Sequence, residues 1–173
     1  MYNFDKIINR RGTKSAKWDN LKSLYGDEEL LPLWVADMDF EAPPEVIKAL
    51  TERAEHGVYG YTFISDEYCE AVRGWMKRRH NWQIEKEWIL YTPGVVPAIS
   101  YAIKAFTQPR DKIIIQTPVY HPFYHTIEEN ERYIVKNPLV YRDGQYHMDL
   151  ENLERIIDDS VKMLILCSPH NPV

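Results

Sequence analysis

Three short segments of the sequence each combine a proline, a small polar residue and a group that can bind a ligand. They are residues 92–96, 117–120 and 168–172. Each follows an apolar run that predicts a β-strand. Because ligands of open α/β sheets bind beyond the carboxyl ends of the strands, the three segments together predict one ligand site.

The segment Gly94-Val95-Val96 has the properties of a phosphate site. It precedes a stretch with helical periodicity, and the first N–H groups of a helix lack internal partners and lie at the positive end of the helix dipole. Gly94 lets the main chain approach an anion closely. Taken alone, a glycine before a helix indicates only a turn. The segment matches neither of the two common nucleotide-binding glycine motifs.

Tyr120 and Asn171 add an aromatic ring and a carboxamide to the other two segments. A tyrosine can stack on a flat heteroaromatic ring, and an asparagine amide can donate a hydrogen bond to a phenolate oxygen. Taken alone, core packing accounts for the tyrosine and a turn accounts for the asparagine. Only the recurrence of such groups at three strand ends favours a binding site.

The elements that must position these segments alternate along the chain from residue 88 onward. Apolar runs predict strands at residues 88–91, 112–116, 133–135 and 161–167. Stretches with helical spacing lie between them. This alternation predicts an α/β fold with a mostly parallel sheet flanked by helices on both faces. Before the last helix, Asp143-Gly144 predicts the turn of a hairpin.

Two more helices are predicted earlier in the chain, after a segment around residues 10–20 that lacks periodicity and predicts a loop. Pro43-Pro44 opens the first helix, and Gly57 is placed to end it. Ser65 is placed to cap the second helix. The buried face predicted for that helix consists of Val72, Trp75 and Met76.

The composition excludes several classes of protein. The chain has 173 residues, 45% of them hydrophobic, and a formal net charge of −5. No polybasic segment favours nucleic acid or an anionic membrane as a partner, and no apolar stretch is long enough to span a bilayer. Two distant cysteines, Cys69 and Cys167, predict neither a disulfide framework nor a metal site. The charged N-terminal segment lacks the apolar core of a signal peptide, which indicates a cytoplasmic protein.

Five segments of the chain together resemble a known family. They are PLWVADMDF, HGVYGYT, TPGVVPAIS, TPVYHPFY and CSPHNPV, at residues 32–40, 56–62, 92–100, 117–124 and 167–173. Their order resembles that in the pyridoxal-phosphate (PLP) enzymes of fold type I, the superfamily of the class I and II aminotransferases. The first two segments resemble the cystathionine β-lyase branch of that superfamily, the MalY/PatB-type C–S lyases.

This resemblance implies a domain organisation and a set of partners. Residues 1–45 would form an N-terminal arm that belongs to the small domain. Residues 46–173 would form the N-terminal part of the large PLP-binding domain, which the missing C-terminal half of the polypeptide would complete. The expected partners are an amino-acid substrate and a second copy of the protein in a homodimer.

The resemblance also assigns cofactor-binding roles to single residues. Gly94, with the amides of Val95 and Val96, would hold the phosphate of PLP. Tyr120 would stack on the pyridine ring, and Asn171 would donate a hydrogen bond to the 3′ oxygen of that ring.

Further residues receive roles in the same way. Tyr61 would reach across the dimer interface to the phosphate of the neighbouring subunit's cofactor. The main chain of Val35 and Ala36 would lie near the substrate carboxylate. Taken alone, an aromatic residue in a loop is equally well explained by packing. The resemblance also implies a cis bond between Asn171 and Pro172.

The catalytic lysine is expected outside this sequence. In the family it forms the Schiff base with PLP and lies downstream of the segment that ends at residue 173, as do the aspartate that pairs with the pyridine nitrogen and an arginine that binds the substrate. No catalytic residue is therefore assigned here, and this chain alone is expected to be inactive.

The function implied for the full-length protein is that of a C–S β-lyase. It would cleave cystathionine or a similar cysteine thioether and release a thiol, pyruvate and ammonia. An aminotransferase of the same fold is one alternative, and a regulatory or inert protein without catalysis is another. A nucleotide binder of the Rossmann type would fit the alternation of strands and helices, but the sequence lacks its glycine motif and acidic ribose partner.

Overall fold

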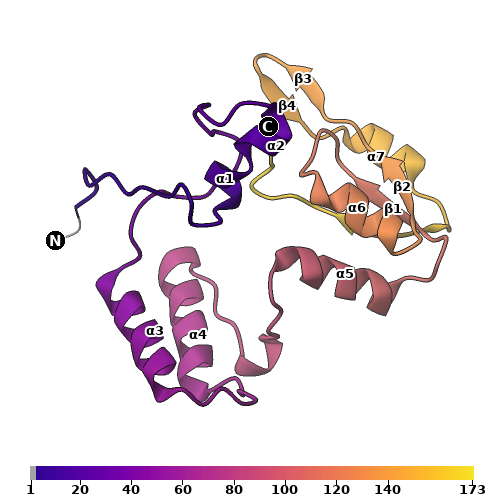
Figure 1. Cartoon of the computed structure of the whole chain (residues 1–173). Helices are drawn as coiled ribbons and strands as arrows, with labels where there is room; N and C mark the ends of the chain where they lie inside the picture. Colours follow the sequence, from indigo (N-terminus) through magenta and orange to yellow (C-terminus); the bar gives the residue numbers. More distant parts are fainter. Residues whose placement is uncertain (1–2) are drawn as a thin grey trace. The chain divides into compact units, whose positions relative to one another are not determined.

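The computed structural model describes residues 3–173, which divide into two compact units (Figure 1). The first unit ends at Thr62 and the second begins at Phe63. The domain boundary predicted after residue 45 refers to the domains of the full-length protein and stays a prediction. Within residues 3–173, no helix has both the length and the hydrophobicity required to cross a membrane.

Residues 3–62, the described part of the first unit, form three helices. They are α1 (Ala16–Asp19), α2 (Leu21–Tyr25) and α3 (Pro44–His56). Pro44 lies in the first turn of α3, and Gly57 ends the helix with a φ of 71°, as the sequence predicts. Glycine adopts this left-handed conformation without the steric cost that a Cβ brings. Between α2 and α3 the chain is irregular.

The second unit begins with the helix α4 (Asp66–His80). The Ser65 hydroxyl accepts a hydrogen bond at 3.3 Å from the main chain of the first turn, which confirms the predicted N-cap. Of the predicted buried face, Val72 and Met76 are only partly buried, and Trp75 is 53% exposed and lies 5.4 Å beneath the Arg79 guanidinium. The buried residue of α4 is Cys69, which that face did not include.

A three-stranded parallel sheet forms the centre of the second unit. Its strands are β1 (Lys112–Ile115), β2 (Tyr133–Lys136) and β5 (Val161–Ile165), in the order β2-β1-β5. Ile113, Ile114 and Ile115 of the central strand are all buried, as expected for a strand covered on both faces. The predicted α/β class with a mostly parallel sheet is confirmed.

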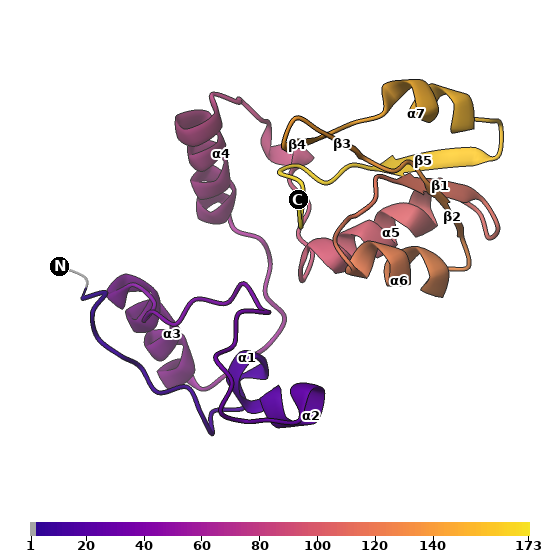
Figure 2. The same ribbon diagram turned by 90° about the horizontal axis from the view of Figure 1, so that it is seen from above.

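Helices cover both faces of this sheet, as Figure 2 shows. On one face lie α5 (Val95–Phe106) and α6 (Pro122–Glu129), and on the other lies α7 (Leu150–Ile156). The apolar core beneath α5 and α6 consists of Ile103, Ile113, Ile115, Val119, Phe123, Ile127 and Ile165. Burial of these side chains holds the two helices on the sheet.

A two-stranded antiparallel hairpin precedes α7. It pairs β3 (Val140–Arg142) with β4 (Gln145–His147). The turn residues Asp143 and Gly144 have φ values of 53° and 77°, which is the backbone of a type I′ turn and confirms the predicted hairpin. A cross-strand tyrosine pair with ring centroids 5.0 Å apart supports the pairing.

The strand predicted at residues 88–91 is wrong. A short 3₁₀ helix, η1 (Lys86–Trp88), occupies its start, and the residues that follow pair with no strand in the described part of the chain. Leu90 and Tyr91 are largely exposed. An apolar run has the composition of a strand, but a strand also needs a hydrogen-bonded neighbour.

A buried guanidinium ties together the ends of two helices. Arg132 Nε donates to Thr107 Oγ1 at 2.8 Å, and Arg132 Nη2 donates to Thr107 O at 2.6 Å. Arg132 Nη1 donates to Asn130 O. Thr107 follows α5 and Asn130 follows α6, so the cation meets the carbonyl ends of both helices, where the helix dipoles are negative.

We expect Arg132→Met to destabilise the protein. The change leaves the buried Thr107 carbonyl without the guanidinium donor, which costs about 1–3 kcal/mol. The control Arg155→Met removes an exposed guanidinium and should change the free energy of unfolding by less than about 0.5 kcal/mol. Urea unfolding followed by circular dichroism measures both variants, and equal midpoints would contradict the role given to Arg132.

Candidate functional site

The carboxyl ends of β1 and β5 lie next to each other because the two strands are parallel and adjacent. Their last residues, Ile115 and Ile165, are partners in the sheet register. Residues 117–120 and 168–172 therefore leave the sheet at the same edge. The structure thus brings together two of the three segments that the sequence predicts to form a site.

A hydrogen bond joins these two segments directly. His170 Nε2 lies 2.7 Å from Pro118 O, and an imidazole N–H can donate to that carbonyl. Tyr120 follows Pro118 by two residues, and Asn171 follows His170. His170 therefore joins the loop that contains Tyr120 to the loop that contains Asn171. The sequence gives no signal for this role, because the bond exists only when the two strands are neighbours.

The start of α5 has the backbone of an anion site. Gly94 precedes the helix with a φ of 153° and a ψ of 169°, a region that only glycine adopts without strain. The first intrahelical bond runs from Ala98 N to Gly94 O at 3.1 Å. The N–H groups of Val95 and Val96 precede that bond, and Pro97 has no N–H. Two adjacent main-chain donors therefore lie at the positive end of the helix dipole.

Helix α5 carries these donors to the edge where β1 and β5 end. A short connection, residues 107–111, joins α5 to β1, so the helix runs back along the sheet against the strand direction. Ile99 and Ile103 pack it onto the core. Figures 1 and 2 both place the start of α5 and the C-terminus of the chain on the same side of the sheet. The third segment reaches this edge on a helix and not, as predicted, at the end of a strand.

Tyr120 and Asn171, which are predicted to supply an aromatic ring and an amide, lie in different surroundings. Tyr120 meets the buried Phe123 edge-on, with ring centroids 5.9 Å apart, and stays 40% exposed. Asn171 is exposed, and its bond to Pro172 is cis, as the resemblance implies. A partly exposed ring that packs against Phe123 and an exposed amide can both contact a ligand.

The other predicted site residues belong to the first unit. Tyr61 is fully exposed, Ala36 is exposed and Val35 is partly buried. The Val35 carbonyl accepts a hydrogen bond from Asp37 N at 2.9 Å, which forms a tight turn around Ala36. The roles of these residues in ligand binding stay predictions.

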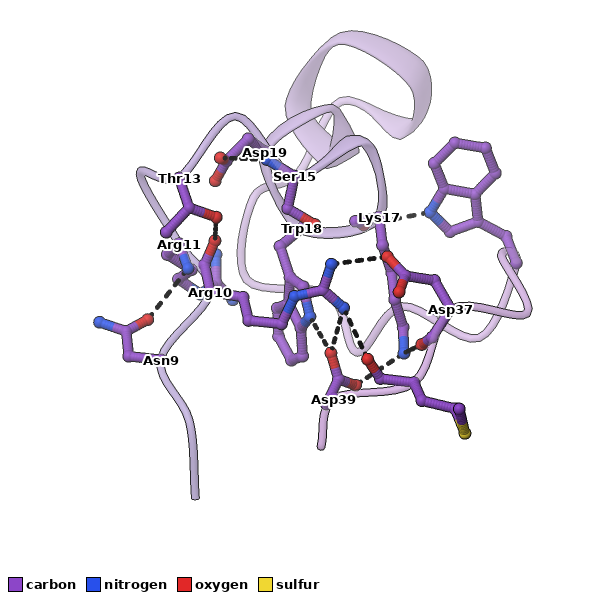
Figure 3. Close-up of polar contacts among 12 residues, drawn as sticks. Asn9, Arg10, Arg11, Thr13, Ser15, Lys17, Trp18, Asp19, Asp37 and Asp39 are labelled. Carbon is purple, nitrogen blue, oxygen red and sulfur yellow. Dashed lines mark hydrogen bonds and ion pairs between the residues drawn. The ribbon is translucent and has the colours of Figure 1, made fainter. Parts of the chain in front are cut away.

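A cluster of opposite charges surrounds this turn (Figure 3). Arg10 Nη2 lies 2.6 Å from Asp37 Oδ2, and Arg10 Nη1 lies 2.8 Å from Asp39 Oδ1. Lys17 Nζ lies 2.6 Å from Asp39 Oδ2. Trp18 Nε1 donates to Asp39 Oδ1 at 2.8 Å. We refer to these five residues as the Asp39 cluster.

Hydrogen bonds within the Asp39 cluster favour its charged forms. The bond from the Lys17 ammonium is the largest cause of a pKa for the Asp39 carboxyl that lies well below its usual range, and bonds from Trp18 and Arg10 lower it further. Hydrogen bonds to Asp37 and Asp39 raise the pKa of Arg10. The sequence predicts only a loop around residues 10–20, because no periodicity marks contacts of this kind.

Most of the chain matches a known family. Residues 28–173 match the model of the family described as aminotransferase class I and II. Cystathionine beta-lyase PatB of Bacillus subtilis (strain 168) is 51% identical over 171 residues, which are 98% of this chain and 44% of that protein.

Similar proteins of known structure share the fold. A PLP-bound "putative aminotransferase" from Clostridium difficile 630 is 48% identical with a TM-score of 0.93, over 100% of this chain and 45% of that one. Cystalysin from Treponema denticola, whose structure contains a pyridoxal 5′-phosphate cofactor, is 44% identical with a TM-score of 0.91, over 99% and 44% of the two chains. The chain therefore spans less than half the length of these relatives. Because the family match covers residues 28–173 and the fold agrees with it, the chain belongs to the class I and II aminotransferase family.

Proposed function

We propose that the whole protein is a PLP-dependent C–S β-lyase. It cleaves cystathionine or a similar cysteine thioether and releases a thiol, pyruvate and ammonia. The observation that carries the proposal is the 51% identity to cystathionine beta-lyase PatB over 98% of this chain. The bound cofactors of the C. difficile protein and of cystalysin support PLP as the cofactor.

The donors at the sheet edge fit PLP. The phosphate is an anion, and the N–H groups of Val95 and Val96 lie at the positive end of α5. The pyridine ring is flat and suits stacking on Tyr120. The 3′ oxygen is an acceptor and suits the Asn171 amide. The combination of an anion site, an aromatic ring and an amide donor supports this cofactor over a ligand with only one of these groups.

When bound, PLP supplies an electron sink for negative charge that develops on the substrate carbon beside it. The residues of this chain bind the cofactor and orient it. The amides after Gly94 fix the phosphate end, and Tyr120 fixes the plane of the ring. Asn171 draws electron density toward the 3′ oxygen by donating a hydrogen bond. His170 holds the loops of Tyr120 and Asn171 together through its contact with the first of them.

The proposal extends to partners and location. The substrate is an amino acid whose carboxylate lies near the main chain of Val35 and Ala36. A homodimer brings Tyr61 to the phosphate of the neighbouring subunit's cofactor. The enzyme works in the cytoplasm. The resemblance of residues 32–40 and 56–62 to the C–S lyase branch supports these assignments.

An aminotransferase of the same fold is the second candidate. The family carries that description, and the C. difficile protein is named for it. Both activities need the same grip on the cofactor, so the residues at the sheet edge do not separate them.

We expect the whole protein, supplied with PLP, to release pyruvate from cystathionine in steady state. A lyase breaks the bond between the β-carbon and sulfur and needs no keto-acid acceptor, whereas an aminotransferase needs one. A coupled assay for pyruvate, run with and without an added keto acid, measures the difference. Amino transfer to the keto acid without release of pyruvate would reject the lyase and favour the second candidate.

We expect Val95→Pro to weaken PLP binding. Proline suits the first position of a helix but has no N–H, so it removes one phosphate donor while α5 keeps its start. The loss of one hydrogen bond to a charged group costs about 1.5–3 kcal/mol, which weakens binding roughly ten- to a hundredfold. Titration of the apoprotein with PLP, followed by absorbance, gives the dissociation constant.

The matched control is Val95→Ala, which shortens the side chain and keeps the N–H. It should bind PLP within about twofold of the unchanged protein, because an exposed side chain at this position contributes little. If the proline and alanine variants bound PLP equally well, these amides would not be the phosphate donors.

A further inference from the structure

Lys17 contacts the residues on both sides of residues 35–36. Its carbonyl accepts a hydrogen bond from Trp34 Nε1 at 3.2 Å. Its ammonium donates to Asp37 O at 2.7 Å and to Asp39 Oδ2 at 2.6 Å. Lys17 therefore holds the main chain immediately after residues 35–36 and contacts the Trp34 side chain immediately before them.

The contacts that fix this turn are partly shielded from water. The side chain of Lys17 is 11% exposed and that of Arg10 is 22% exposed. Solvent screens such ion pairs less than it screens fully exposed ones. Arg10 adds a second constraint, because its guanidinium spans the carboxylates of Asp37 and Asp39. Contacts from both Lys17 and Arg10 thus hold the segment that follows residues 35–36.

The positive and negative charges of the Asp39 cluster balance one another. Two cations face two carboxylates, and each carboxylate has a cation within 2.8 Å. The cluster therefore leaves no net charge to attract a ligand. What it presents to the outside is the shape of the turn, at which Ala36 is exposed.

We propose that Lys17, Asp39 and Arg10 are positioning residues that fix the main chain of residues 35–36 in the form that binds the substrate carboxylate. This role rests on the proposed function, because it requires an amino-acid substrate at that turn. The three residues act through the main chain and do not touch the substrate. A binding group held by a charged frame keeps its direction when the substrate arrives, which favours tight binding.

The test compares Lys17→Met and Asp39→Asn in the whole protein loaded with PLP. Each change should raise KM for cystathionine about tenfold and change kcat by less than about threefold, because a misdirected carboxylate site weakens the binding of substrate and transition state alike. The double variant should be no worse than about twofold beyond either single variant, since both remove the same contact.

Two further variants serve as controls. Lys17→Arg keeps a cation beside Asp39 and should recover part of the loss in KM. Lys22→Met removes an exposed lysine of the same unit, which pairs with Glu28 at 3.2 Å, and should leave KM unchanged. Urea unfolding of every variant shows whether it is folded.

Hydrogen exchange gives a readout that is independent of activity. The amides of residues 33–40 should exchange about tenfold faster in Lys17→Met and Asp39→Asn than in the unchanged protein, because the frame that holds them is lost. The same amides in Lys22→Met should exchange at the original rate.

The outcomes separate the proposal from its alternatives. Faster exchange with an unchanged KM would overturn it, since the frame would then have no part in substrate binding. A raised KM without faster exchange would overturn it as well, because the lost charge would act on the substrate directly. If the variants changed neither the exchange rate nor KM, the proposal would also be overturned.

Failure of the proposed function would look different. The unchanged protein would then release no pyruvate, and the dissociation constant of the amino acid, followed by PLP absorbance, would replace KM in the same comparison of variants. A protein that bound no amino acid at all would reject both proposals.

Discussion

The candidate site depends on the parallel pairing of β1 with β5. Because adjacent parallel strands end at the same edge of a sheet, the loops that follow them meet there whatever their own sequences. Three consecutive buried isoleucines in β1 stabilise this arrangement, since they fill both faces of the sheet. The contact between His170 and Pro118 then joins the two loops. The pairing of the strands places the two loops at the same edge, and the side chains of the loops only adjust their arrangement there.

The two units of the chain rely on different forces. In the second unit, an apolar cluster holds α5 and α6 on the sheet, and such burial is strong but has no direction. In the first unit, the Asp39 cluster joins the short helix α1 to segments of irregular chain by short charge-assisted hydrogen bonds, which do have direction. Burial of apolar side chains therefore positions whole helices on the sheet, whereas the charged contacts of the Asp39 cluster fix the path of the loop around residues 37–39.

The sequence predicts best what depends on few neighbouring residues. The end of α3 at Gly57, the cap at Ser65 and the turn at Asp143-Gly144 all follow from local backbone preferences. The parallel sheet follows from the alternation of a long segment. The strand at residues 88–91 failed because pairing requires a partner that the segment itself does not encode. The Asp39 cluster and the His170 contact escaped because each joins residues far apart in the sequence, without any period to mark them.

The donors at the start of α5 belong to the main chain, so their chemistry is independent of the side chains beside them. Over evolutionary time, residues 95 and 96 can be exchanged for most other amino acids while their N–H groups persist. Gly94 has no such freedom, because a Cβ at its φ of 153° and ψ of 169° is strained. Among diverging descendants the glycine should be inherited while its neighbours change, and the two main-chain donors should be kept through those changes.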